Sequence, residues 1–212
     1  MLFRSGIANL TAIPAACGPE QVRAFDTGPG NMVIDAVVAR FFGRKFDRDG
    51  RLAARGHVLE KVVAPILRQP FFRRSAPKTA GREEFGREFV SDFLRRCRGA
   101  RKEDVVATAT ALTARSIAQA VRDFVLSGGR FAELIVSGGG AFNPTLMRML
   151  TEELQPLNIR LRHSDEFGLP AEAKEAVAFA VLAYQTWGHL PGNIPSATGA
   201  VRPAILGKIS YV

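Results

Sequence analysis

Four short segments of the chain have the apolar pattern of β-strands. Gly6–Pro14 alternates loosely between apolar and polar residues and ends at a proline, and Gln21–Phe25 follows it after a turn. The run Glu133–Val136 predicts a buried strand, and Arg160–His163 predicts a fourth strand. The predicted strands are therefore short and lie in two groups far apart in the sequence.

Between these strands, apolar residues recur with the 3.6-residue period of helices. The longest such segment, Lys102–Leu126, is rich in alanine, the strongest helix former. The other predicted helices are Met32–Phe42, His57–Gln69, Gly81–Cys97, a helix beginning at Asn143-Pro144, and Ala171–Trp187. The tail Leu190–Pro203 is too rich in Pro, Gly and Ser to be regular. The pattern predicts an α/β fold rich in helix.

Composition narrows the class of protein. The chain has 212 residues, of which 47% are hydrophobic and 23% charged, values typical of a globular protein. No apolar run reaches the roughly 18 residues of a membrane span, and no secretory signal opens the chain. Its two cysteines, Cys17 and Cys97, form no disulfide framework or zinc set. We therefore expect a soluble, cytoplasmic protein without a membrane partner.

The charge alone does not identify a partner. The net charge is +9, and it comes from 23 Arg against only 6 Lys. The segments richest in arginine also contain acidic residues, as on a solvated helical surface. Because no nucleic-acid-binding motif accompanies this charge, we do not expect a nucleic-acid partner.

Two glycine-rich loops are the strongest candidates for chemistry. In each, a predicted strand ends in glycines and a helix begins directly afterwards, so free N–H groups at the helix start favour phosphate. The candidate residues of the first loop are Asp26, Thr27, Gly28, Gly30 and Asn31, and those of the second are Gly138, Gly139, Gly140 and Asn143. The second loop matches neither the dinucleotide fingerprint nor the P-loop. The alternative is that both are tight turns whose glycines allow close packing.

Other residues give weaker evidence for a functional site. The three histidines, His57, His163 and His189, are far apart and lack the spacing of metal ligands. Glu172 and Glu175 open a predicted helix, where a carboxylate complements the helix dipole. From the residues alone, the sequence indicates an α/β protein with one or two phosphate-binding loops.

Five motifs resemble the anhydro-N-acetylmuramic acid kinase family. They are FDTGPGNMVIDA (Phe25–Ala36), PKTAGREEF (Pro77–Phe85), SGGGAFNPTLM (Ser137–Met147), AEAKEAVAFAVLAY (Ala171–Tyr184) and LPGNIPSATGA (Leu190–Ala200). The resemblance runs from Gly6 nearly to the C-terminus, whereas residues 1–5 do not fit the family. It implies that residues 1–212 form the C-terminal lobe of an actin-like sugar-kinase fold, with a mixed sheet and helices on its faces.

The resemblance also implies a reaction. Family members use ATP to phosphorylate 1,6-anhydro-N-acetylmuramic acid while water opens the anhydro bridge, giving N-acetylmuramic acid 6-phosphate for peptidoglycan recycling. ATP and Mg²⁺ are the implied cofactors. The loop Asp26–Asn31 would lie at the phosphates, with Asp26 at Mg²⁺, and Gly138, Gly139, Gly140 and Asn143 would border the nucleotide. Glu175 would lie on the sugar side.

The family's N-terminal lobe, with its own phosphate loop and the catalytic base, has no counterpart in this sequence. We therefore expect no catalytic residue in this chain, no turnover by the chain alone, and a partner that is the missing N-terminal lobe or a second copy in a homodimer. The alternative function is a non-catalytic module that binds nucleotides or muropeptides.

Overall fold

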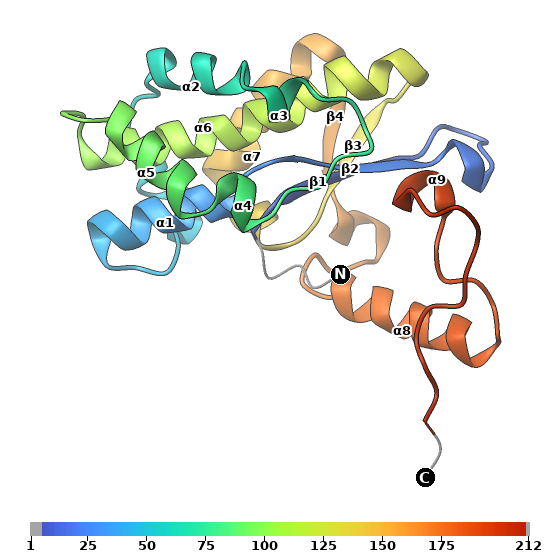
Figure 1. Cartoon of the computed structure of the whole chain (residues 1–212). Coiled ribbons are helices and arrows are strands. Elements are labelled where there is room, and N and C mark those ends of the chain that lie inside the picture. The colour runs from blue at the N-terminus through green and yellow to red at the C-terminus, as the bar shows by residue number, and fades with distance from the viewer. Residues whose placement is uncertain (1–5, 211–212) are drawn as a thin grey trace.

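The computed structural model describes residues 6–210 as a mixed α/β protein (Figure 1). Residues 1–5, which we expected not to fit the family, lie outside the described part, as do 211–212. The strands are β1 (Ala8–Ala12), β2 (Arg23–Gly28), β3 (Glu133–Val136) and β4 (Arg160–His163). The helices are α1 (Asn31–Phe42), α2 (Glu60–Leu67), α3 (Pro70–Arg73), α4 (Arg82–Phe85), α5 (Arg87–Arg96), α6 (Lys102–Ala120), α7 (Pro144–Leu154), α8 (Lys174–Trp187) and α9 (Pro195–Thr198).

The described strands form two separate two-stranded sheets. β1 and β2 are an antiparallel pair, in which Ala8 lies opposite Gly28 and Ala12 opposite Arg23. β3 and β4 are parallel, with Glu133 opposite Arg160, and α7 provides the crossover between them. The four strands occur where the sequence predicts them.

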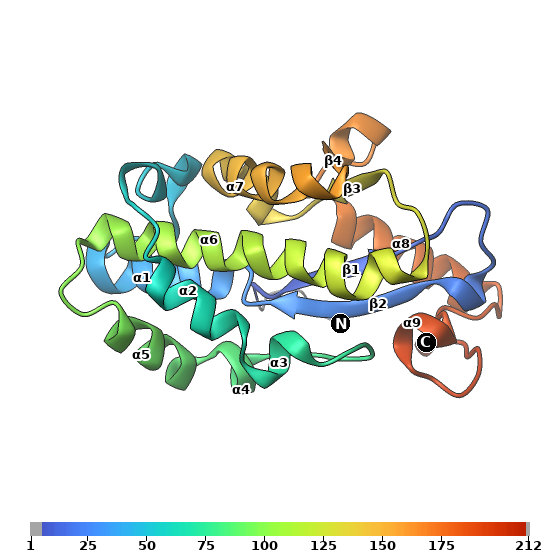
Figure 2. The ribbon, with the colours of Figure 1, turned by 90° about the horizontal axis from the view of Figure 1, so that it is seen from above.

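Helix α6 is the central element of the fold (Figure 2). Thirteen of its nineteen residues are buried, from Val105 to Ala120, because other elements surround it. Two of its three buried threonines are satisfied within the helix: the Thr110 hydroxyl donates to the Val106 carbonyl at 3.0 Å, and Thr108 donates to the Asp104 carbonyl at 2.6 Å. Small and self-satisfied side chains thus let α6 lie in the middle of the protein.

The core has two parts that share α6. One lies between α1, α2, α5 and the first half of α6, and its largest fully buried side chains include Phe85, Phe93 and Leu112. The other lies between the β1–β2 pair, the second half of α6 and α7, around Phe25, Leu150 and Leu154. Both parts of the core therefore pack against α6.

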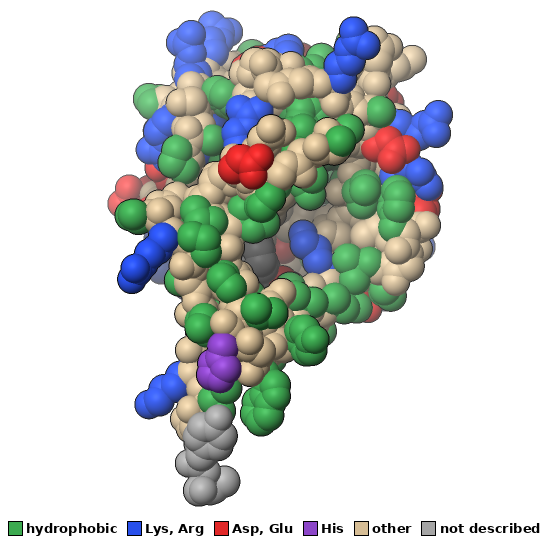
Figure 3. All heavy atoms as spheres, turned by 90° about the vertical axis from the view of Figure 1, so that its right-hand side faces the viewer, with side chains coloured by type: hydrophobic (Ala, Val, Ile, Leu, Met, Phe, Trp, Pro, Cys, Tyr) green, Lys and Arg blue, Asp and Glu red, His purple; other side chains and the backbone are tan. Residues whose placement is uncertain are grey.

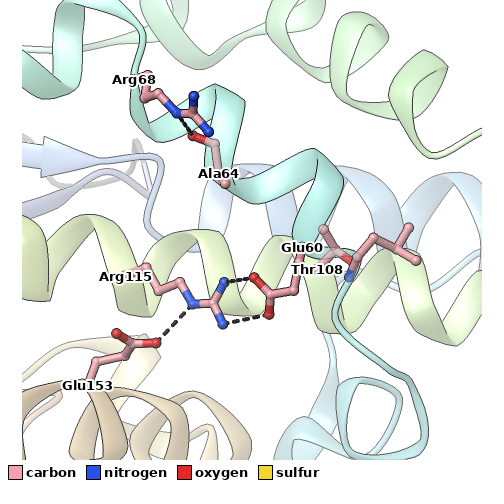
Figure 4. Close-up of polar contacts among 7 residues, drawn as sticks. Glu60, Ala64, Arg68, Thr108, Arg115 and Glu153 are labelled. Atoms are coloured by element: carbon pink, nitrogen blue, oxygen red, sulfur yellow. Dashed lines mark hydrogen bonds and ion pairs between the residues drawn. The ribbon is translucent and has the colours of Figure 1, made fainter.

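An arginine network fastens three of these helices together (Figure 4). Arg115 of α6 donates to both carboxylate oxygens of Glu60 in α2, at 2.5 and 2.8 Å, and to Glu153 in α7 at 2.8 Å. The hydrogen bonds from Arg115 keep the pKa of Glu60 below its usual value. A two-pronged guanidinium contact of this kind fixes orientation as well as distance.

Five sequence predictions need correction. The helix expected to run to Leu126 ends at Ala120, where a π-helical turn over Val121–Val125 follows, and the tail expected to be irregular contains the short helix α9. The second strand does not end at Phe25 but continues to Gly28, so Asp26 and Thr27 belong to β2 and not to a loop. The helix expected over Gly81–Cys97 is two helices, because Gly86 adopts a non-helical conformation between α4 and α5. β3 is not a buried strand: Ile135 is 50% exposed.

Helix α8, the predicted Ala171–Trp187 helix, begins at Lys174 and buries none of its residues. Its exposed side chains include Val177, Phe179, Val181, Tyr184 and Trp187. Hydrophobic side chains cover the lower part of the face in Figure 3, where α8 and the C-terminal segment lie. Among residues 6–210, no helix is both long and apolar enough to cross a membrane.

Candidate functional site

A cavity of about 470 Å³ brings several of the predicted site residues together. Its lining includes Gly30 and Asn31 from the first loop, Gly138–Gly140 from the second, and Glu175 from α8. The two loops are more than a hundred residues apart in sequence, yet they form one end of the same cavity. The structure thus joins six of the ten predicted site residues in one place.

The first turn is held in shape by its surroundings. Gly30 has φ +55°, a conformation that favours glycine, and a Cβ at this position would overlap the Gly6 carbonyl. The Thr113 hydroxyl of α6 donates to the Gly30 carbonyl at 2.6 Å, and this hydrogen bond holds the turn against α6. Helix α1 begins at the next residue, Asn31, which lines this end of the cavity. The N–H of Met32, the second residue of α1, already donates to the Pro29 carbonyl at 3.1 Å.

The second turn lies against the first. Gly138 has φ +86°, and a short 3₁₀ turn over Gly139–Phe142 follows it. A Cβ built on Gly139 would lie 3.7 Å from Asn31 Nδ2, and one on Gly140 would lie 3.5 Å from Asn31 Oδ1. These are ordinary contact distances, so the two turns are neighbours with a narrow space between them. The Gly138 N–H already donates to the Ala171 carbonyl at 3.1 Å. The N–H groups of Gly139 and Gly140 and the Asn31 carboxamide are therefore the candidate donors to an anionic ligand.

The rim of the cavity on the α8 side is charged. Glu172, Lys174 and Glu175 all line it, at or just before the first turn of α8. Glu175 therefore lies at the same cavity as the glycine turns but on a separate wall. Carboxylates are poor neighbours for phosphate and good acceptors for hydroxyl groups.

Asp26, Thr27 and Gly28 do not line this cavity. Asp26 is 4% exposed, and its carboxylate accepts the Ala80 N–H at 2.7 Å. Burial raises the pKa of Asp26, although the Ala80 hydrogen bond and the nearby Lys78 ammonium oppose this. Gly28 is explained by packing, because a Cβ there would overlap the Ser116 hydroxyl of α6.

Asn143 has a structural role in the described fold. Its side-chain oxygen accepts the Leu146 N–H at 3.0 Å and so caps the N-terminus of α7, with Pro144 at the first helical position. It does not line the cavity. Its predicted contact with a nucleotide stays a prediction, as does binding by Asp26, Thr27 and Gly28.

The donor set does not fit a metal site built by this chain alone. Among residues 6–210, no group of three or more His, Cys, Asp or Glu side chains could hold a metal ion. Asp26, the predicted Mg²⁺ ligand, is buried and already accepts a backbone N–H. Mg²⁺ bound with ATP takes most of its ligands from phosphates and water.

Some of the residues that line the cavity were not predicted from the sequence. The strand residues Ile7–Leu10 and Leu134–Val136, and Thr113 and Ile117 of α6, all line the cavity. No motif identifies them, because it is the pairing of distant elements that brings them here.

Fold and cavity together define a mixed α/β protein with a glycine-lined, phosphate-compatible site at the N-terminus of a helix. The sequence model of the anhydro-N-acetylmuramic acid kinase family matches residues 1–212, the first five included. The chain therefore belongs to the anhydro-N-acetylmuramic acid kinase family.

Two relatives illustrate the match. The chain is 46% identical over 212 residues to the anhydro-N-acetylmuramic acid kinase of Salinibacter ruber, covering 99% of this chain and 53% of that protein. It is 41% identical over 206 residues to the enzyme of the same name from Bacillus cereus, covering 97% of this chain and 54% of that protein. The chain thus spans about half the length of the curated relatives that it matches.

Proposed function

We propose that the chain supplies the nucleotide-binding lobe of an anhydro-N-acetylmuramic acid kinase with an actin-like fold. The proposed reaction consumes ATP, water and 1,6-anhydro-N-acetylmuramic acid. It gives ADP and N-acetylmuramic acid 6-phosphate, for cytoplasmic recycling of peptidoglycan. Family membership supports the reaction class, since the relatives bear this kinase name.

One observation carries the proposed site: the Asn31 side chain lies between two glycine turns that face one cavity. In our proposal, the N–H groups of Gly139 and Gly140 and the carboxamide of Asn31 bind the ATP phosphates. Phosphoryl transfer depends chiefly on such positioning and on stabilising charge, so fixed amides are suited to it. Mg²⁺, when bound with ATP, would neutralise the phosphate charge.

We assign the wall formed by the start of α8 to the sugar. Glu175 would accept a hydrogen bond from a substrate hydroxyl, because a carboxylate is placed better against hydroxyls than against phosphate. The cavity would then separate an amide-rich phosphate end from a carboxylate-bearing sugar end.

Substitution of Gly139 tests the phosphate end. An alanine Cβ there would meet only Asn31 at 3.7 Å, so Gly139→Ala should fold normally while narrowing the space between the turns. We expect the Kd for ATP to rise about tenfold, measured by calorimetry, because a methyl group would displace a phosphate oxygen. Gly188→Ala is the matched control, since its Cβ would also have ordinary contacts, nearest at 3.5 Å, and it lies outside the cavity. Equal ATP affinity in both variants and the unaltered chain would contradict the proposed phosphate site.

The reaction itself is tested by ADP release with ATP, Mg²⁺ and 1,6-anhydro-N-acetylmuramic acid. The chain would be assayed alone and after co-expression with the part of the Salinibacter ruber enzyme that it does not match. We expect turnover only in the second case. Turnover by the chain alone would contradict the expectation that a second lobe is needed, and no turnover in either case would contradict the proposed reaction.

A further inference from the structure

One buried threonine of α6 differs from the other two in where its hydroxyl group donates. The Thr108 and Thr110 hydroxyls donate to carbonyls one turn earlier in α6, a common arrangement for threonine in a helix. Thr113 is equally buried, at 1% exposed, but its hydroxyl donates to the Gly30 carbonyl at 2.6 Å. Gly30 lies 83 residues earlier in the chain. The Thr113 hydroxyl therefore bonds the first glycine turn and not its own helix.

Helix α6 meets this turn at a second point. It lies across the β1–β2 pair, whose second strand leads into the turn (Figure 2). A Cβ on Gly28, the last residue of β2, would lie 2.3 Å from the Ser116 hydroxyl oxygen. That hydroxyl donates to the Thr113 carbonyl at 2.9 Å, so its contact with Gly28 is one of packing. Thr113 thus supplies a hydrogen bond to the turn, and Ser116 supplies close packing.

The conformation of Gly30 is one that the residue itself does not enforce. Gly30 has φ +55° and ψ −135°, and glycine reaches many other conformations at little cost. The peptide group that joins Gly30 to Asn31 is planar. Holding the Gly30 carbonyl toward α6 therefore also fixes the direction of the Asn31 N–H and the position of the Asn31 Cα.

The position of Asn31 matters because its carboxamide lies beside the second glycine turn. A Cβ built on Gly139 would lie 3.7 Å from Asn31 Nδ2, and one built on Gly140 would lie 3.5 Å from Asn31 Oδ1. These residues line one cavity together with Gly30 and Thr113. A misplacement of about 1 Å in such a site is enough to weaken its action strongly. The hydrogen bond from α6 therefore sets the geometry of the candidate phosphate donors.

We propose that Thr113 is a positioning residue for the ATP phosphates. Its hydroxyl anchors the Gly30 carbonyl and thereby holds the Asn31 carboxamide between the two glycine turns. Without this hydroxyl, the turn samples other conformations, and the apparent affinity for ATP falls in proportion to the fraction of molecules that keep the competent one. This inference rests on the proposed function, because it concerns the same phosphate site.

The first test compares the same substitution at two positions of α6. Thr113→Val replaces the hydroxyl by a methyl group, and Thr110→Val does so at a residue that is 0% exposed and does not line the cavity. We expect the Kd for ATP, measured by calorimetry, to rise about tenfold in Thr113→Val. It should stay unaltered in Thr110→Val. Thr113→Ser keeps a hydroxyl and should restore the affinity of the unaltered chain.

A second readout follows Asn31 directly and needs no nucleotide. The side-chain amide signals of Asn31 in a nitrogen–proton NMR spectrum of the chain would be assigned by their loss in Asn31→Asp. Thr113→Val should shift or broaden these signals, because the carboxamide then has no single fixed place. Thr110→Val and Thr113→Ser should leave them in place. Circular dichroism checks that every variant is folded.

A further pair of variants keeps the test decisive if valine is not accommodated. Thr113→Ser and Thr113→Ala differ by one hydroxyl group, so weaker ATP binding and shifted Asn31 signals in the alanine variant alone would support the proposal. Equal behaviour of the two would overturn it.

Two other results would overturn the proposal. One is a Thr113→Val chain with unaltered ATP affinity and unaltered Asn31 signals. The other is an equal effect of Thr113→Val and Thr110→Val, which would make Thr113 a core residue only. If the unaltered chain binds no ATP, the proposed phosphate site is wrong, whereas a shift of the Asn31 signals in Thr113→Val alone would still support Thr113 as the residue that holds Asn31.

Discussion

Helices α6 and α8 are similar in sequence but differ in their surroundings. Both are rich in alanine and other apolar residues over most of their length. Thirteen of the nineteen residues of α6 are buried, whereas α8 buries none of its fourteen. A helix that is apolar on all sides is usually enclosed by other elements. The comparison shows that α6 has its neighbours within this chain and that α8 lacks them here.

The same contrast extends to the sheets and the aromatic residues. Around α6, Phe85 contacts the rings of Phe71 and Phe89 at centroid distances of 5.0 Å. Beside α8, Ile135 of β3 is half exposed and Phe179 is 48% exposed. The α6 region is therefore a closed core, whereas α8 and β3 leave large apolar side chains exposed.

The largest expected difference between the two regions comes from a pair of phenylalanine truncations. Phe85→Ala should lower the free energy of unfolding by roughly 3–5 kcal/mol, because Phe85 is 1% exposed in the core. Phe179→Ala on α8 should change it by no more than about 0.5 kcal/mol. Urea unfolding followed by circular dichroism measures both. Similar losses of unfolding free energy in the two variants would show that α8 packs into the core in solution. That result would contradict the difference between α6 and α8.

The packed region also encloses a lysine, which should make stability depend on pH. Lys78 is 4% exposed; its Nζ donates to the Phe71 carbonyl at 3.2 Å and lies 4.6 Å from the Phe124 ring centroid. Burial, followed by the nearby Arg74, lowers the pKa of Lys78 from 10.5 to about 8. Between these two pH values the unfolded chain keeps the proton that the folded chain has lost.

Stability should therefore rise as the pH increases from about 8 to 10.5, by on the order of 2 kcal/mol. Urea midpoints at a series of pH values measure the rise. Lys78→Met should remove it, whereas Lys174→Met, at an exposed position of α8, should leave it in place. A rise that persists in Lys78→Met would assign the pH dependence to another group.

The local parts of this fold could be predicted from the sequence. The 3.6-residue period located α6, and the Asn143-Pro144 pair located the start of α7. The Gly-Gly stop did not mark the end of α6, because a π-helical turn over Val121–Val125 follows the helix before the glycines. β3 and β4 have the predicted bounds. The end of β2 was missed, since Asp26-Thr27-Gly28 has the composition of a turn and only pairing with β1 makes it a strand.

The candidate site could be predicted only in part. The glycine turns at Gly30 and Gly138–Gly140 were recognisable, because a strand ending in glycines before a helix is a local signal. Their meeting at Asn31, and the contribution of Thr113, depend on how α1 packs on α6. The exposure of α8 could not be predicted from the sequence either. Its apolar sequence predicts burial, but a helix is buried only where other elements pack against it.

The smallest expected effect comes from substitution of Asn143. It distinguishes two roles of this residue, capping of α7 and contact with nucleotide. If it acts only as the cap of α7, Asn143→Ala should lower the free energy of unfolding by about 1 kcal/mol without changing ATP affinity. Asn143→Asp should keep the cap, because aspartate caps helices about as well as asparagine. If Asn143 also contacts nucleotide, Asn143→Asp should weaken ATP binding, since a carboxylate repels phosphate. Urea unfolding and calorimetric titration on both variants distinguish these outcomes. An Asn143→Asp variant with unaltered stability and weaker ATP binding would extend the nucleotide site beyond the cavity wall to the start of α7.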